Sequence, residues 1–172
     1  DLGIDLISDL SSGDNLVVSS VATVNATNIS NFIATSSTSN SGTANLTAGN
    51  SGSIITMTNS ASGDYTITGG AGIDHLTGGT GNDVLSGGAS GNDNLTGGSG
   101  NDIFNVTSGF DTIGDLLTGD SLIVSNGAKV NAINVNHFIA TDQTSNSGEV
   151  KIICDDSNAL INLSLVLQGR YT

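Results

Sequence analysis

Aspartates that recur at nearly constant spacing are the residues of this sequence whose chemistry is easiest to interpret. They stand nine or ten positions apart, and most of them end a segment rich in glycine. The series comprises Asp64, Asp74, Asp83, Asp93, Asp102, Asp111 and Asp120. Glycine-rich turns leave their carbonyl oxygens uncovered, and each carboxylate adds negative charge beside them. Several hard oxygen atoms in one turn suit Ca²⁺, which takes about six to eight oxygen ligands.

The residues after each aspartate predict how these turns are positioned. A large apolar residue follows two places later, between polar or small neighbours: Leu76, Leu85, Leu95, Phe104, Ile113 and Leu122. Such a triplet predicts a very short strand that buries one side chain. Two segments make one coil, so alternate aspartates stack: Asp74, Asp93 and Asp111 at one edge, and Asp64, Asp83, Asp102 and Asp120 at the other. Stacked carboxylates repel each other unless a cation lies between them. The spacing therefore predicts divalent cations between successive coils.

Four tandem copies of Gly-Gly-x-Gly-x-Asp-x-(large apolar)-x occupy residues 69–105, and the third copy has one extra residue near Ala89. This pattern resembles the RTX, or haemolysin-type calcium-binding, nonapeptide repeat. The resemblance implies an all-β fold, a right-handed parallel β-roll (β-solenoid), with Ca²⁺ bound in the turns by glycine carbonyls and paired aspartates. At the matching positions, the implied carbonyl ligands belong to Gly70, Gly72, Gly79, Gly81, Gly88, Gly98 and Gly100.

The sequence on either side of this block is duplicated. Residues 1–66 and 107–172 align without a gap at an offset of 106, with 29 of 66 positions identical. We therefore expect three parts: a β flank module at 1–66, an RTX calcium-binding β-roll at 67–106, and a second copy of the flank module at 107–172. A fragment of a long array in a large, repetitive bacterial secreted or surface protein is the simplest source of this organisation.

The flanks contain short apolar runs separated by turn residues, and none has a helical period. They either continue the parallel coil with wider turns or form a small antiparallel sandwich, and we favour the continuing solenoid. Asp5 and Asp14 keep the nine-residue spacing without glycine coils before them, so they are expected to form weak or empty half-sites. Arg170 occupies the position of Asp64 in the second copy, where a cationic side chain could replace calcium.

Composition limits the alternatives. A net charge of −13 disfavours nucleic acid as a partner, and no run of residues is apolar enough for membrane insertion. The single cysteine, Cys154, lies in an apolar run and is expected in the core. His75 and His137 are expected on the surface, and no set of residues predicts catalysis, so the chain is not expected to be an enzyme.

The function predicted from these features is a calcium-binding structural module of a secreted or cell-surface repeat protein, of the adhesin, S-layer or extracellular filament type. It would fold on binding Ca²⁺. Similar RTX proteins leave bacteria unfolded by type I secretion, which implies an extracellular location at the bacterial cell surface. The alternative is a C-terminal accessory module of a type I-secreted enzyme such as a protease, lipase or epimerase. Head-to-tail self-association through the coil ends is a further expectation.

Overall fold

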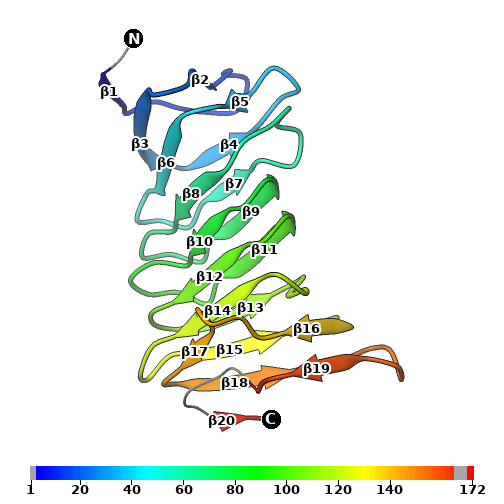
Figure 1. The fold of residues 1–172 in the computed structure, drawn as a ribbon. Coiled ribbons are helices and arrows are strands. Elements are labelled where there is room, and N and C mark those ends of the chain that lie inside the picture. The colour runs from blue at the N-terminus through cyan, green and yellow to red at the C-terminus, as the bar shows by residue number, and fades with distance from the viewer. Residues whose placement is uncertain (1–2, 165–169) are drawn as a thin grey trace.

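The computed structural model describes residues 3–164 and 170–172, and the side chain of Arg170, with the prediction made for it, lies outside this description. The described residues form short strands stacked as a β-solenoid of about eight turns (Figure 1). None of them belongs to a helix that is long and apolar enough to span a bilayer. The all-β parallel solenoid predicted from the sequence is therefore confirmed, and the flanks continue the coil instead of forming a sandwich.

Two eight-stranded sheets form the long faces of the solenoid, and their strands pair in parallel. The first sheet contains β1 (Ile4–Ile7), β3 (Thr23–Ile29), β6 (Thr43–Ala48), β8 (Tyr65–Thr68), β10 (Val84–Ser86), β12 (Ile103–Val106), β14 (Ser121–Val124) and β17 (Ser145–Asn146). The second contains β4 (Asn31–Ile33), β7 (Ile54–Thr56), β9 (His75–Thr80), β11 (Asn94–Ser99), β13 (Phe110–Ile113), β15 (Lys129–Ala132), β18 (Glu149–Ile152) and β20 (Arg170–Tyr171). The chain alternates between these sheets through the glycine block.

Coils of the flanks have a third side. In the first flank it is formed by β2 (Val17–Val18) and β5 (Ser39–Asn40), and in the second by β16 (His137–Ile139) and β19 (Leu160–Asn162). These coils are longer than those of the glycine block. Thr23 and Thr43, which pair across a flank coil, are further apart along the chain than Asn94 and Thr112, which pair across a coil of the glycine block. The glycine block is thus a two-sided roll between two three-sided segments.

The two flank copies use opposite sheets. Strands β1, β3 and β6 belong to the first sheet, whereas their counterparts in the second copy, β13, β15 and β18, belong to the second. The offset between the copies therefore contains a half-integral number of coils. Each flank copy presents its equivalent surfaces on the opposite side of the solenoid.

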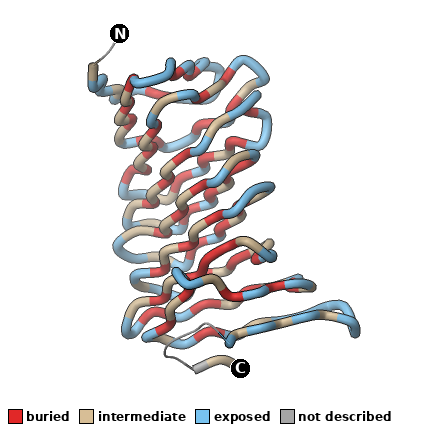
Figure 2. Tube along the Cα trace, in the orientation of Figure 1, coloured by how far each residue is buried: buried red, intermediate tan, exposed pale blue. Residues whose placement is uncertain are grey.

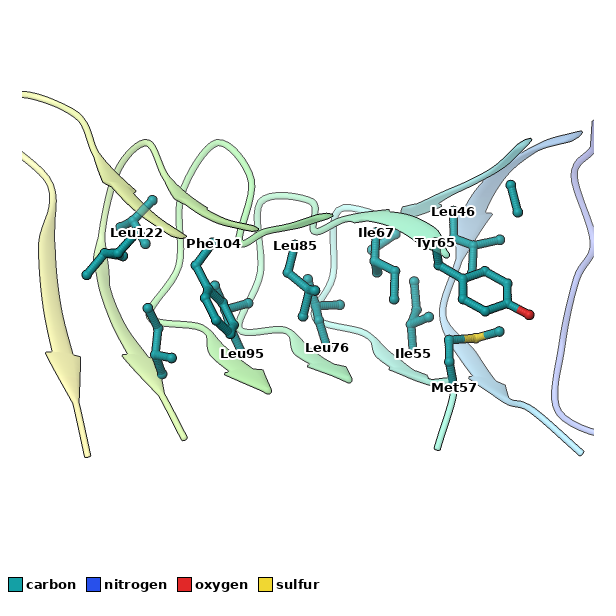
Figure 3. Packing of buried hydrophobic residues seen from close by; sticks show 14 of the residues in the cluster. Leu46, Ile55, Met57, Tyr65, Ile67, Leu76, Leu85, Leu95, Phe104 and Leu122 are labelled. Atoms are coloured by element: carbon teal, nitrogen blue, oxygen red, sulfur yellow. The ribbon is translucent and has the colours of Figure 1, made fainter. Parts of the chain in front are cut away.

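The core is a single column of inward side chains. Leu46, Ile67, Leu85, Phe104 and Leu122 from the first sheet face Ile55, Leu76 and Leu95 from the second (Figure 3), and all are at most 1% exposed. Buried residues alternate with more exposed ones along each coil, as Figure 2 shows. The apolar residue after each aspartate is therefore buried as its spacing predicts. This packing positions the aspartate two residues before each inward apolar side chain, next to or within the start of the strand.

Candidate metal centre

Strand register stacks the aspartates of the glycine block in two rows. Asn94 pairs with both His75 and Thr112, which places Asp93 between Asp74 and Asp111. On the other edge, Ile103 pairs with both Val84 and Ser121, which places Asp102 between Asp83 and Asp120. All six aspartates are at most 2% exposed. The two predicted rows exist over these six residues, and the extra residue of the third copy is absorbed in the turn before Asp93.

In every stacked aspartate except Asp74, one carboxylate oxygen accepts a hydrogen bond from the backbone of the preceding coil. The Oδ1 atom of Asp102 accepts a hydrogen bond from the backbone N–H of Asp83 at 2.8 Å, and Oδ1 of Asp120 accepts one from Asp102 at 2.9 Å. The other edge repeats this contact, from Asp74 to Asp93 at 2.8 Å and from Asp93 to Asp111 at 3.0 Å. The backbone N–H groups therefore offset part of the electrostatic repulsion between the stacked carboxylates. The sequence reasoning missed this contribution.

The second oxygen has no such partner in several of these residues. Asp74 Oδ1, Asp83 Oδ2 and Asp102 Oδ2 are buried without a hydrogen bond to any described residue. A buried carboxylate oxygen without a donor costs about 1–3 kcal/mol or more, because its hydration is lost and not replaced. These orphaned oxygen atoms fit a bound cation, which would supply the missing positive charge.

Glycine turns surround the stacked carboxylates, and a carboxylate oxygen fills the space where a Cβ would lie on the first glycine of each pair. A Cβ atom at Gly78 would lie 2.6 Å from the carbonyl oxygen of Gly97 and closer still to the orphaned Asp83 Oδ2. A Cβ at Gly87 would collide with Asp93 Oδ2 and lie 2.9 Å from Asp111 Oδ2, so carboxylates of successive coils converge there.

The other two glycine pairs repeat this contact. Gly97 borders the orphaned Asp102 Oδ2, and Gly69 borders Asp74 Oδ2, which accepts a hydrogen bond from Gly70 N at 2.8 Å. The first glycines of the four pairs were not predicted as site residues, although most of them stand five positions before an aspartate.

The glycines that were predicted as carbonyl ligands superpose along the stack. A Cβ at Gly98 would collide with the carbonyl oxygen of Gly79, and both residues have φ near +107°, a conformation that glycine adopts without strain. Gly100 contacts Gly81 in the same way, Gly88 contacts Gly70, and Gly91, which was not predicted as a ligand, contacts Gly72. The carbonyl of Gly70 also accepts a hydrogen bond from Ala89 N at 3.0 Å, and that of Gly88 accepts one from Thr107 Oγ1 at 2.9 Å. Their role as calcium ligands stays a prediction.

Asp64 lies outside the row in which we placed it. Val84 pairs with Thr66, so Tyr65 and not Asp64 lies beside Asp83. The N–H of Tyr65 donates to Asp83 Oδ1 at 2.7 Å, and its buried hydroxyl lies 2.7 Å from Ser60 Oγ. Asp64 is exposed and accepts a hydrogen bond from Asn82 N at 2.7 Å. The stacking prediction is therefore wrong for this residue, because this coil is one position shorter than the coil between Asp83 and Asp102.

Asp115 is a site residue that the sequence pattern did not reveal. Its two carboxylate oxygens accept hydrogen bonds from the backbone N–H groups of Gly97 and Gly98, at 2.9 and 2.7 Å. It lies outside the glycine-aspartate motif, so no spacing rule points to it. Its carboxylate anchors the glycine pair that borders Asp102.

Electrostatics of the rows favour proton or cation uptake. Burial raises the pKa of Asp83 to about 7, a donated hydrogen bond from Tyr65 opposes the shift, and the charges of Asp102 and Asp64 add to it. Burial likewise raises the pKa of Asp111 and of Asp120 to about 6. The pKa values of Asp93 and Asp102 are raised for the same reason. The rows therefore bind positive charge more readily than exposed carboxylates do.

The donor set suits calcium better than zinc. No group of three or more His, Cys, Asp or Glu side chains that could share a metal ion occurs among the described residues. A cation in these turns would take at most two carboxylates and complete its shell with backbone carbonyls, which is the hard-oxygen environment that Ca²⁺ prefers. His75 and His137 are exposed, as expected. Cys154 is also exposed and was wrongly expected in the core, because β18 ends at Ile152 before reaching it.

Comparison with known families agrees with this geometry. The family model described as the RTX calcium-binding nonapeptide repeat (4 copies) matches residues 62–90 and 88–113. These ranges contain both aspartate rows up to Asp111. No curated protein sequence and no solved structure matches the chain. The chain therefore contains RTX calcium-binding nonapeptide repeats, which form the middle of a longer β-solenoid.

Proposed function

We propose that this chain is a structural module of an exported repeat protein, of the adhesin, S-layer or extracellular filament type, in which bound Ca²⁺ connects successive coils. We further propose that it has no catalytic role. The observation that carries the proposal is the pair of orphaned, buried oxygens Asp83 Oδ2 and Asp102 Oδ2, each bordered by a glycine of its own turn. Bound Ca²⁺ would supply positive charge and oxygen coordination at these positions.

The residues of the chain couple metal binding to folding. In an unfolded chain the aspartates are far apart and hydrated, so they gather no cation. Stacking of the coils brings Asp93 Oδ2 and Asp111 Oδ2 to the same glycine. Folding without a cation leaves these buried charges uncompensated, whereas folding with one satisfies them, so binding free energy becomes folding free energy. A module of this kind stays unfolded at low calcium and folds where calcium is plentiful.

The same coupling would suit an exported protein. The low calcium of a bacterial cytoplasm would keep the chain extended, and millimolar calcium outside the cell would fold it. The buried aspartates support a structural role, because their carboxylates accept hydrogen bonds from backbone N–H groups of the neighbouring coil. A rigid rod of stacked coils is suited to spacing or display at a cell surface.

Far-ultraviolet circular dichroism tests this proposal. The chain is measured in chelator and then in millimolar calcium, with magnesium at the same concentration as the matched control. We expect β-signal to rise with calcium and not with magnesium, because Mg²⁺ demands a smaller octahedral shell. Equal β-signal in chelator and in calcium would contradict metal-coupled folding.

A further inference from the structure

The first described coil carries three exposed aspartates whose counterparts lie directly beneath the glycine block. Asp5, Asp9 and Asp14 correspond, at the offset between the flank copies, to Asp111, Asp115 and Asp120. Asp111 and Asp120 are at most 2% exposed, whereas Asp5, Asp9 and Asp14 are all exposed. We call Asp5, Asp9 and Asp14, together with β1, the N-terminal coil surface.

The counterparts show what this surface can bind. Asp111 Oδ1 accepts the N–H of Asp93 at 3.0 Å, and Asp120 Oδ1 accepts the N–H of Asp102 at 2.9 Å. Between them, Asp115 accepts the N–H groups of Gly97 and Gly98. In the opposite direction, the backbone N–H of Thr112 donates a hydrogen bond to the carbonyl oxygen of Asp93 at 2.8 Å. Together these bonds form the joint between the glycine block and the second flank. Three carboxylates thus receive four backbone donors from one glycine-aspartate coil.

The N-terminal coil surface has the same local structure. Asp14 Oδ2 accepts a hydrogen bond from Ser11 N at 2.9 Å, as Asp120 Oδ2 does from Leu117 N at 2.7 Å. Strand β1 pairs with β3 in the register in which β13 pairs with β15. The turn that contains Asp14 and the register of the strand that contains Asp5 therefore match those of their counterparts.

The same surface is incompletely satisfied. The side chains of Asp5 and Asp9 make no hydrogen bond to any described residue. On β1, Ile7 is only partly buried where its counterpart Ile113 is fully buried, whereas Ile4 is exposed like its outward-facing counterpart Phe110. No described residue covers Asp5, Asp9 or Ile7 as the glycine block covers their counterparts Asp111, Asp115 and Ile113.

We propose that the N-terminal coil surface docks the open end of a glycine-aspartate β-roll, that is, a coil with the chemistry of residues 94–102. The joint would repeat the one at Asp93, Gly97, Gly98 and Asp102, with Asp5, Asp9 and Asp14 as acceptors. It rests on the calcium-dependent fold proposed above, because the donor coil must be folded to align its N–H groups.

The test extends the full chain by a second copy of its own glycine block. Residues 67–106 are joined directly to residue 1 of the complete chain, as residue 106 is joined to residue 107. Calcium stoichiometry is measured by titration calorimetry and the Tm by thermal unfolding, in calcium, for the extended and unextended chains. Asp9→Ala is introduced into both, and Asp142→Ala, at an exposed aspartate whose side chain makes no hydrogen bond to a described residue, is the matched control.

We expect the extended chain to bind more calcium and to unfold in one transition. Asp9→Ala should lower its Tm by about 2–4 °C or more, while leaving the unextended chain unchanged, and Asp142→Ala should affect neither. An extended chain that binds no additional calcium, or that is indifferent to Asp9→Ala, would overturn the docking proposal. A second copy of the chain would instead be the occupant if the unextended chain associates in calcium and Asp9→Ala abolishes that association.

Circular dichroism of the unextended chain separates the two proposals. If its β-signal does not depend on calcium, the proposed function itself fails. If the signal depends on calcium but Asp9→Ala does not change the Tm of the extended chain, only the docking proposal is refuted.

Discussion

Asp102 Oδ1 lies 2.8 Å from the backbone nitrogen of Asp83, one coil away, while Asp102 Oδ2 is buried without a hydrogen bond to any described residue. One carboxylate therefore has two separate tasks. Its first oxygen ties two coils together through the backbone, and its second faces a glycine turn where a bound cation would satisfy it. The same division recurs at Asp83, which makes the stack both a hydrogen-bonded ladder and a set of cation sites.

Removing the charge of Asp102 should separate these tasks. In Asp102→Asn the amide oxygen can still accept the N–H of Asp83, but the buried charge is gone. We expect calcium affinity to fall by at least about tenfold, and stability in chelator to rise. Titration calorimetry and denaturant unfolding measure the two effects. Asp155→Asn, on an exposed turn, is the control, and unchanged affinity in Asp102→Asn would count against a cation at Oδ2.

The raised pKa values predict opposite pH dependences with and without metal. The folded-state pKa is about 7 for Asp83 and about 6 for Asp111 and Asp120, against an ordinary value of 3.8. The folded chain therefore binds more protons than the unfolded chain between about pH 4 and pH 7. In chelator, stability should rise as pH falls through this window.

Calcium binding should weaken over the same pH window, because protons compete for the same oxygens. Denaturant unfolding in chelator and calcium titrations from pH 5 to about pH 8 test the pair of predictions. Calcium affinity that does not change below pH 7 would show that these carboxylates are not the ligands.

A methyl group at Gly78 should clash with the neighbouring coil and with the stacked carboxylate. A Cβ there would meet Asp83 Oδ2 and the carbonyl of Gly97, neither of which can move without disturbing a coil joint. We expect Gly78→Ala to destabilise the calcium-loaded chain by about 2 kcal/mol or more. Gly114→Ala is the matched control, since its nearest neighbour is a side-chain oxygen, Thr96 Oγ1, at 3.2 Å. Equal unfolding midpoints for the two variants would refute the close approach.

Truncating Asp115 should loosen the end of the block. Asp115→Ala leaves the N–H groups of Gly97 and Gly98 without their acceptors, at a cost of about 1–3 kcal/mol. Asp9→Ala removes the corresponding aspartate of the first flank, whose side chain makes no hydrogen bond to a described residue, and should be close to neutral. Thermal unfolding of both variants in calcium decides this, and similar losses in the two would be inconsistent with the assigned role.

Periodic features of this chain could be predicted from sequence because each coil repeats the same constraint. The inward position of Leu85 and Phe104, and the stacking of Asp83 on Asp102, follow from the regular spacing of the repeats. The position of Asp64 could not be predicted in this way. Val84 pairs with Ile103 on one side and with Thr66 on the other, and these two separations along the chain differ by one position. A shift of one position moves a side chain out of its row.

Non-periodic features escaped the sequence reasoning for a different reason. The interaction of Asp115 with two glycine N–H groups depends on how the chain leaves β13, which no motif encodes. The exchange of sheets between the two flank copies requires counting every half coil between them. Cys154 lies in an apolar run, but its exposure depends on where β18 ends.

Anomalous X-ray diffraction from crystals grown in millimolar calcium would show whether cations occupy the glycine turns. We expect calcium peaks there at about 2.3–2.6 Å from Asp83 Oδ2 and Asp102 Oδ2. Turns that remain without such peaks, with the same aspartate oxygens bound to water or protonated, would contradict this expectation.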